Sequence, residues 1–183
     1  MRFRVHRIAL AALTLTSTFS LLAGAAASAV PDDGAAAGSA AGFSTSARAS
    51  NTAPAAMPKV VDLRWGEHGT FDRVVIDLVG KRTGYRVGYV PQLTYDGFGE
   101  PVRLKGKRFI EVAVRPARAH NNDGDSVYTG PRRRQLELAS LRGVAFTGDF
   151  EGVVSFGLAI DRKAPFRVFT LSQPSRLVID VKH

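Results

Sequence analysis

Short runs of alternating apolar and polar residues fill the chain from about residue 58 to its end, and Gly, Pro or Asp separates each run from the next. Runs of four to eight residues that are rich in Val, Ile, Phe and Tyr and alternate with a period of two are typical of β-strands. Eight such strands are predicted, at residues 59–65, 73–79, 85–90, 108–114, 143–149, 153–160, 166–171 and 176–181. Short strands at this spacing predict an all-β fold, either a sandwich or a barrel.

Helix is expected to contribute little to the fold. Residues 132–143 have room for one or two helical turns, but no window of the chain keeps a helical period. The region 58–183 is long enough to bury roughly 65% of the surface of its unfolded chain, so we expect one domain with a hydrophobic core.

Two nearly identical heptapeptides lie about a hundred residues apart: DRVVIDL at residues 72–78 and SRLVIDV at residues 175–181. Because side chains alternate between the faces of a strand, each copy has an aliphatic side for the core and an Arg–Val–Asp side for the outside. If the two strands are antiparallel neighbours, Arg73 faces Asp180 and Asp77 faces Arg176, and two cross-strand ion pairs help to fix the register. The alternative places the strands in different sheets, each with the same motif on its outer face. We favour the first arrangement.

The residues before the strands predict export and a linker. Residues 1–29 combine a basic start, an apolar stretch and the small residues Ala27, Ser28 and Ala29, which is the pattern of a cleaved signal peptide. The apolar stretch is shorter than the roughly 20 residues that a membrane-spanning helix needs, so no transmembrane anchor is expected after cleavage. Residues 30–57 are mostly Ala, Gly, Ser, Thr and Pro, which predicts a flexible linker rather than an Ala-rich helix.

The amino-acid composition bears on how the protein is held outside the cell and on the charge of its expected partner. The chain has no cysteine, so neither a disulfide nor a cysteine-linked lipid anchor can form, and Ala25 stands where a lipoprotein signal would need its cysteine. Loss of the three arginines of the signal peptide leaves 22 Lys and Arg against 16 Asp and Glu, a net charge of +6. A basic exported protein, secreted or associated with the cell wall, favours anionic partners such as wall polymers, and we expect no nucleic acid partner.

The residue types that catalysis usually requires are sparse. After signal cleavage only His68, His120 and His183 remain of the histidines, and neither His68 nor His120 has a histidine at metal-ligand spacing. The chain contains no G-x-S-x-G and no H-E-x-x-H motif. We therefore expect a binding protein without a cofactor or a metal. The enzymatic alternative is a small exported hydrolase that uses His120 with a nearby Asp.

The densest cluster of polar residues lies between residues 114 and 134. NNDGD at residues 121–125 is rich in oxygen ligands but lacks the downstream Glu of an EF-hand, so a polar hairpin or loop is predicted there. Basic residues flank it and would converge if the loop folds back; guanidinium groups bind carboxylate or phosphate in bidentate fashion. The candidate ligand-binding residues in this region are Arg115, Arg118, His120, Arg132, Arg133 and Arg134.

The two ends of the folded region resemble a known family. Residues 164–183, APFRVFTLSQPSRLVIDVKH, pair an aromatic strand with a Pro turn and R-L-V-I-D-V, and residues 71–80 read FDRVVIDLVG. In this combination residues 58–183 resemble the AMIN domains, and the long section 84–106 resembles the AMIN-like variant of exported bacterial proteins. The resemblance implies a β-sandwich and a role in targeting envelope proteins to peptidoglycan. It also makes the outward residues Arg73, Asp77, Arg176 and Asp180 candidate ligand contacts.

Together these observations predict a single β-sandwich domain of roughly eight short strands at residues 58–183, after a signal peptide and a linker. Its expected function is non-catalytic binding of peptidoglycan or another anionic wall polymer, such as a teichoic-type polymer. The remaining alternatives are the small exported hydrolase and a protein-interaction adaptor of the cell envelope.

Overall fold

The computed structural model describes residues 42–183, which form ten β-strands and no helix. The predicted signal peptide and the first part of the predicted linker lie outside the described residues. The strands are β1 (Arg48–Ser50), β2 (Lys59–His68), β3 (Phe71–Val79), β4 (Gly84–Val90), β5 (Arg108–Arg115), β6 (Arg133–Gln135), β7 (Leu141–Phe150), β8 (Val153–Ile160), β9 (Phe166–Ser172) and β10 (Ser175–Lys182).

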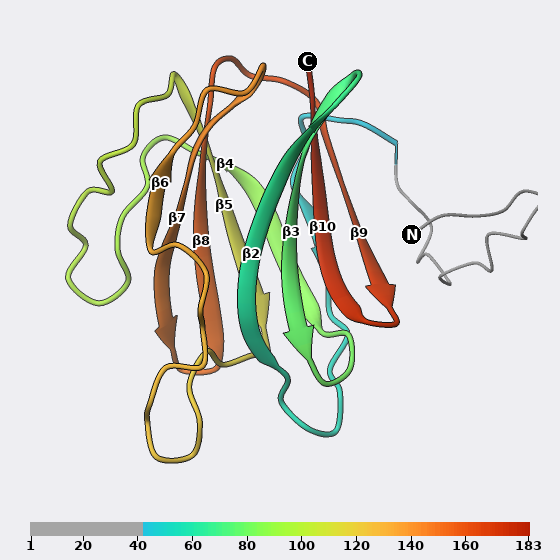
Figure 1. Cartoon of the computed structure of the whole chain (residues 1–183), viewed down its shortest axis with the longest axis vertical. Coiled ribbons are helices and arrows are strands. Elements are labelled where there is room, and N and C mark those ends of the chain that lie inside the picture. Colours follow the sequence, from blue (N-terminus) through green and yellow to red (C-terminus); the bar gives the residue numbers. More distant parts are fainter. Residues whose placement is uncertain (1–41) are drawn as a thin grey trace, which may run out of the picture. The chain divides into compact units, whose positions relative to one another are not determined.

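The strands form two antiparallel sheets that face each other. One sheet has six strands in the order β1-β4-β5-β8-β7-β6, and the other has four in the order β2-β3-β10-β9. Figure 1 shows β6, β7 and β8 on the left and β3, β10 and β9 on the right. The predicted β-sandwich is confirmed, and the eight predicted strands correspond to β2–β5 and β7–β10. The two further strands, β1 and β6, have three residues each and carry too short a pattern to be read from sequence.

The core lies between the sheets and is built from the inward side of each strand. Ile76 of β3 and Ile179 of β10 are fully buried, as are Phe156 of β8 and Phe166 at the start of β9. The alternation of buried and partly exposed positions along β3 follows the predicted period of two. Complete burial of a side chain of this size stabilises a fold by about 1.5–3 kcal/mol, so this period-two pattern accounts for much of the core.

The two heptapeptides are neighbouring strands. β3 and β10 pair antiparallel, with Arg73 opposite Asp180 and Asp77 opposite Arg176. The favoured arrangement is therefore confirmed, and the placement of the two copies in separate sheets is excluded. Because β10 also pairs with β9, it is a central strand of its sheet, with a neighbour on either side.

Asp72, which begins the first heptapeptide, connects the two sheets. It is fully buried, and its Oδ2 atom accepts backbone N–H groups from Ser140 (2.7 Å) and Leu141 (2.8 Å) at the start of β7. Its Oδ1 atom lies 2.9 Å from Nε2 of His183. A buried carboxylate is tolerated only when its lone pairs are satisfied, and these three partners satisfy it.

Residues 42–57 differ from the flexible linker that we expected. Ser44 exchanges two backbone hydrogen bonds with Phe166, of 3.0 and 2.8 Å, at the edge of the four-stranded sheet. A few residues later β1 pairs with β4 at the edge of the other sheet. The segment 42–50 thus bonds to both sheets, and these backbone hydrogen bonds offset the entropy of ordering a chain that is poor in large apolar residues.

The long section between β4 and β5 covers part of the outer face of the six-stranded sheet. Leu93 and Val102 pack with Ala145 of β7 in a small cluster separate from the main core. Glycines lie beneath this loop: a Cβ atom at Gly157 would come within 2.6 Å of Leu93. The loop is the yellow-green segment at the left of Figure 1. Gly and Ala at outward positions of β7 and β8 therefore make room for residues 91–107.

The first part of the outer edge of β2 is also occupied. The backbone N–H of Val60 donates to the carbonyl of Arg118 (2.8 Å), and the N–H of Thr129 donates to the carbonyl of Val61 (2.9 Å). The segment between β5 and β6 thus runs along this edge. Residues 132–143, where one or two helical turns had room to form, instead hold β6, bends and the start of β7. Within residues 42–183 no helix has the length and hydropathy needed to cross a membrane.

Candidate functional site

The outer face of the four-stranded sheet is organised around the carboxylate of Asp180. Arg73 of β3 donates from Nε to Oδ1 (2.7 Å) and from Nη2 to Oδ2 (2.9 Å). Arg167 of β9 donates from Nε to Oδ2 (2.7 Å) on the other side. Asp180 is fully buried although it points outward, because two guanidinium groups cover it. Two cations on one carboxylate leave this cluster with a net positive charge.

Aromatic rings surround the same two arginines. The guanidinium carbon of Arg73 lies 5.1 Å from the ring centre of Phe71, and that of Arg167 lies 4.8 Å from the ring centre of Phe43. The ring of Phe169 lies within 6 Å of both guanidinium groups. Such contacts attract the cation to the ring face and hold the arginine side chains in place. We call this surface the arginine face; its members are Phe43, Arg64, Phe71, Arg73, Arg167, Phe169 and Arg176.

The second predicted ion pair of the heptapeptides, between Asp77 and Arg176, is absent from the arginine face. Asp77 instead receives a bidentate contact from Arg64 of β2, of 2.6 and 2.9 Å. Arg64 is directly opposite Val75, so its long side chain reaches Asp77 diagonally. The Nε atom of Arg176 donates to the backbone carbonyl of Pro174 (3.4 Å). Within the described residues Arg176 has no carboxylate partner, and its charge is free to meet a ligand.

Hydrogen bonding keeps the paired arginines charged. The bond to Asp180 raises the pKa of Arg73, and the bond to Asp77 raises the pKa of Arg64. Arg64, Arg73 and Arg176 line an open pocket of about 280 Å³ together with His68. Chemically, this pocket offers guanidinium donors to an anionic group, and Trp65 also lines it.

The basic residues around the 121–125 loop are placed in several different surroundings. Arg132 lies over the ring of Phe146 (4.5 Å) and donates to the hydroxyl of Ser126 (3.1 Å), so it packs against the sandwich. Arg115 lines a shallow pocket beside Glu151. The side chain of Arg118 is partly buried, and its Nε atom has no hydrogen-bond partner.

His120 has a carboxylate neighbour, as the enzymatic alternative requires. Its Nδ1 atom lies 2.6 Å from Oδ2 of Asp149, which also accepts the backbone N–H of Ala119. Oδ1 of Asp149 is buried without a partner. Asn121 accepts the backbone N–H groups of Asp123 and Asp125, so the loop is closed by its own side chain. Residues 42–183 contain no group of three or more His, Cys, Asp or Glu side chains that is placed to hold a metal ion.

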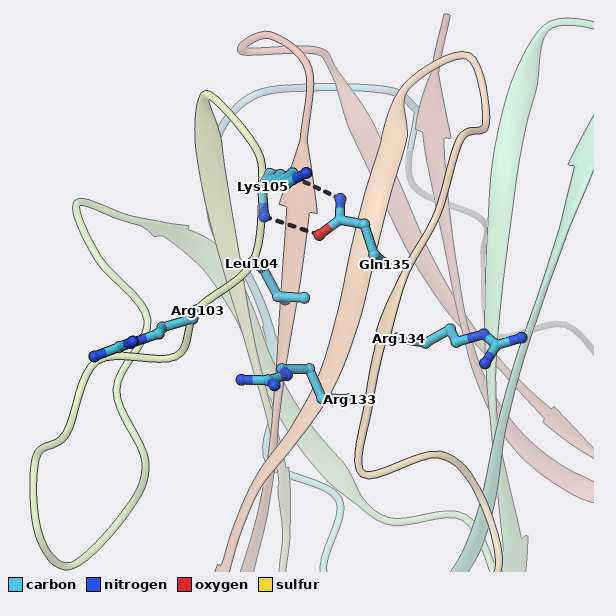
Figure 2. Close-up of a pocket in the computed structure, with 6 residues that line it drawn as sticks. All are labelled: Arg103, Leu104, Lys105, Arg133, Arg134 and Gln135. Atoms are coloured by element: carbon cyan, nitrogen blue, oxygen red, sulfur yellow. Dashed lines mark hydrogen bonds between the residues drawn. The ribbon is translucent and has the colours of Figure 1, made fainter.

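A second basic surface lies where β6 meets the end of the 91–107 loop. Arg133 and Arg134 line an open groove of about 740 Å³ there with Arg103 and Lys105. Figure 2 shows that Gln135 bridges the two walls through its hydrogen bonds to Lys105. Of the six basic-loop candidates, the structure brings only Arg133 and Arg134 into this groove.

Sequence reasoning missed several residues of both surfaces. Arg64 and Arg167 could have been found from the sequence. Each lies in a predicted strand between two apolar residues, so the alternation with a period of two places it on the outward side. Arg103 and Lys105 carry no such signal, since their section has no period and its course over the sheet depends on packing. Phe43 lay in the predicted linker, where no contact was expected.

Comparison with known proteins gives one match. The family model of the AMIN-like domain matches residues 58–183. No curated protein and no solved structure matches the chain. The matched range covers β2 to β10 and leaves out β1 and Ser44, which therefore lie before the boundary of the family domain.

Proposed function

The chain belongs to the AMIN-like domain family, and on that basis we propose that it is an exported module that binds peptidoglycan or another anionic wall polymer through the arginine face. The predicted family is confirmed. AMIN-like domains occur in exported cell-envelope proteins and are generally non-catalytic binding modules. The ligand and the site on this chain are the proposed parts.

The observation that carries the proposal is the difference between the two outer faces. Residues 91–107 pack over part of the outer face of the six-stranded sheet, and their apolar side chains fill it. The four-stranded sheet instead presents a pocket lined by Arg64, Arg73 and Arg176. Asp180 holds Arg73 and Asp77 holds Arg64 in advance, so a ligand need not order these two side chains on binding.

The chemistry of the arginine face suits a peptide-bearing glycan. Carboxylates of stem peptides accept bidentate hydrogen bonds from guanidinium groups, and Arg176 has donors that no carboxylate of the described residues uses. Trp65, which also lines the pocket, offers aromatic surface to a sugar ring. A polymer that repeats both groups would make several such contacts at once and gain affinity from their number.

A pull-down on purified sacculi tests this proposal. In the double variant Arg64→Ala/Arg176→Ala the contacts of Arg73 and Arg167 to buried Asp180 stay intact, so the fold should be kept. Loss of two charge-assisted contacts is expected to weaken binding by about tenfold or more. Thermal melting of the same protein checks that the domain is still folded.

The matched control removes the same charge elsewhere. Arg86 of β4 and Arg162 after β8 are both exposed, and neither lines the pocket of the arginine face. The variant Arg86→Ala/Arg162→Ala should bind sacculi nearly as well as the parent protein. An equal loss of recovery in the two double variants would show that binding follows net charge alone. Recovery of both at the level of the parent protein would show that Arg64 and Arg176 do not contribute. Either result would remove the arginine face from the mechanism.

The His120–Asp149 contact keeps a hydrolase as the second candidate. A nucleophilic mechanism also needs a hydroxyl or a water beside the histidine, and the side-chain hydrogen bonds within residues 42–183 link His120 to Asp149 alone. Incubation with muramyl peptides, esters and glycans separates the two functions, because a binding module turns over none of them. Co-purification from an envelope extract would instead favour the adaptor.

A further inference from the structure

The groove at the free edge of the six-stranded sheet has an unusual charge. Two segments form its walls: residues 103–105 at the end of the long loop, and strand β6. Six residues line its volume of about 740 Å³: Arg103, Leu104, Lys105, Arg133, Arg134 and Gln135. Four of the six are cationic and none is acidic. The ion pairs within the described residues involve none of these four cations.

The two walls are held at a fixed separation. The side chain of Gln135 accepts the backbone N–H of Lys105 (2.9 Å) and donates to its carbonyl (3.1 Å), as the dashed lines in Figure 2 show. Leu104 lies over Gly143 of β7, where a Cβ atom would come within 2.8 Å of a Leu104 methyl group. The groove is therefore built into the fold and does not depend on a ligand to bring its walls together.

The cations approach the groove from both walls. In Figure 2 Arg103 and Arg133 extend toward the same side, one from the loop and one from β6, while Arg134 extends to the opposite side. This difference follows from the alternation of side chains along a strand. Arg103 and Arg133 are thus the pair that one ligand on that side of the groove can contact.

We propose that this groove binds a linear polyphosphodiester, with successive phosphates held by Arg103, Arg133 and Lys105. A phosphodiester carries its non-bridging oxygens on a tetrahedral phosphorus, so it can accept hydrogen bonds from both walls. A carboxylate can also accept from two guanidinium groups, as Asp180 does, but its oxygens lie in one plane, so donors on two walls suit the tetrahedral anion better. The groove is open, so a long chain can enter and leave it, and the repeated charge of such a chain matches cations placed along the groove.

This inference rests on the proposed function for its setting in the cell envelope, but it concerns a different surface. The arginine face lies on the four-stranded sheet and the groove lies at the edge of the six-stranded sheet. The two surfaces can therefore be disabled one at a time.

The test measures binding of purified poly(glycerol phosphate) to the full domain, with poly(L-glutamate) of matched charge as the second probe. Arg103 and Arg133 are both exposed, so Arg103→Ala/Arg133→Ala should fold normally. We expect this variant to bind poly(glycerol phosphate) about tenfold more weakly. The plot of the logarithm of the binding constant against the logarithm of the salt concentration should become shallower, with the magnitude of its slope smaller by roughly one to two. The parent protein should bind poly(L-glutamate) more weakly than poly(glycerol phosphate).

Arg86→Ala/Arg162→Ala is again the control for charge and should leave poly(glycerol phosphate) binding nearly unchanged. An equal loss in the two double variants would overturn the groove as the site. The parent protein could bind the two polymers equally well, and Arg103→Ala/Arg133→Ala could weaken binding of both to the same extent. These two results together would overturn the assignment of phosphate.

Sacculi stripped of their phosphate polymers separate this inference from the proposed function. Binding to stripped sacculi should be lost in Arg64→Ala/Arg176→Ala and kept in Arg103→Ala/Arg133→Ala. If stripped sacculi are not bound at all while poly(glycerol phosphate) is still bound through the groove, the arginine face fails and the groove stands. If stripped sacculi are bound through the arginine face while poly(glycerol phosphate) is not bound through the groove, the groove fails and the arginine face stands.

Discussion

Arg73 and Asp180 lie directly opposite each other on neighbouring strands, joined by two hydrogen bonds although 107 residues separate them in the chain. Asp180 accepts a further bond from Arg167, so a carboxylate on the outer face of a sheet is as buried as the core. Asp77 occupies the same place in the other heptapeptide, but it is partly exposed and is bound by Arg64 alone. One motif thus yields two different environments in one sheet.

The first prediction compares these two aspartates. Asp180→Ala leaves Arg73 and Arg167 side by side without their shared anion, and we expect it to lower the free energy of unfolding by about 2–3 kcal/mol. Asp77→Ala should cost less than about 1 kcal/mol, because the Arg64 side chain is more than half exposed and solvent screens the pair. Urea unfolding of both variants measures the difference. Similar losses for the two would show that the burial of Asp180 contributes nothing to stability.

The second prediction concerns the contact between the sheets. In Asp72→Ala the buried N–H groups of Ser140 and Leu141 lose their acceptor, so the free energy of unfolding should fall by about 2–4 kcal/mol. His183→Ala removes only one partner of Asp72 and leaves both N–H groups satisfied. Its effect should be less than half as large in the same unfolding experiment, and a larger effect of His183→Ala would contradict this account.

The strands and their pairing were accessible from the sequence because both depend on local patterns. Alternation with a period of two located eight strands, and the charges of Arg73 and Asp180 favoured the antiparallel register that the structure has. The environment of Asp180 was not accessible in the same way. Asp180 is buried partly because Arg167 of β9 covers it, and Arg167 is in reach only because β9 lies beside β10. The order of strands in a sheet cannot be read from the pattern of a single sequence.

The course of the long loop was inaccessible for a related reason. Its residues pack on outward Gly and Ala positions of β7 and β8, such as Gly157 beneath Leu93. In sequence these small residues resemble ordinary strand positions with weak propensity. The groove that contains Arg103 exists only because the loop is held there, so the sequence alone did not group Arg133 and Arg134 with Arg103 and Lys105.

The third prediction tests the N-terminal segment. A protein beginning at residue 58, where the family match starts, lacks the Ser44–Phe166 bridge, β1 and the contact of Phe43 with Arg167. We expect it to be less stable than one beginning at residue 42 by about 2 kcal/mol, since several edge hydrogen bonds and an aromatic contact are lost. Amide hydrogen exchange should rise along β4 and β9 first. Identical melting curves for the two proteins would show that the segment does not contribute.

The fourth prediction is an alkaline pH dependence. Burial raises the pKa of the Tyr128 hydroxyl above its ordinary value of 10.0, and the nearby Asp62 raises it further while Arg132 lowers it. Above pH 10 the unfolded chain therefore releases this proton before the folded domain does, and stability falls as the pH rises. Tyr128→Phe should show a shallower fall over the same range.

Unfolding measured at neutral pH and between pH 10 and 12 checks the Tyr128 prediction. Burial also raises the pKa of Tyr85 and Tyr89, so Tyr128→Phe should reduce the alkaline loss without abolishing it. A curve parallel to that of the parent protein would contradict the assignment of the effect to Tyr128.

The edges of both sheets are partly covered by other segments of the chain. The six-stranded sheet ends in strands of three residues, of which β6 is charged, and the edge of β2 is bonded by the segment that contains Arg118 and Thr129. At the edge of β9 the backbone of Ser44 takes up both hydrogen bonds of Phe166. Long unpaired edges template aggregation and fibril growth, and a domain without disulfides has no covalent defence against either. The covering segments therefore shorten the stretches of edge to which a strand of a second molecule could pair.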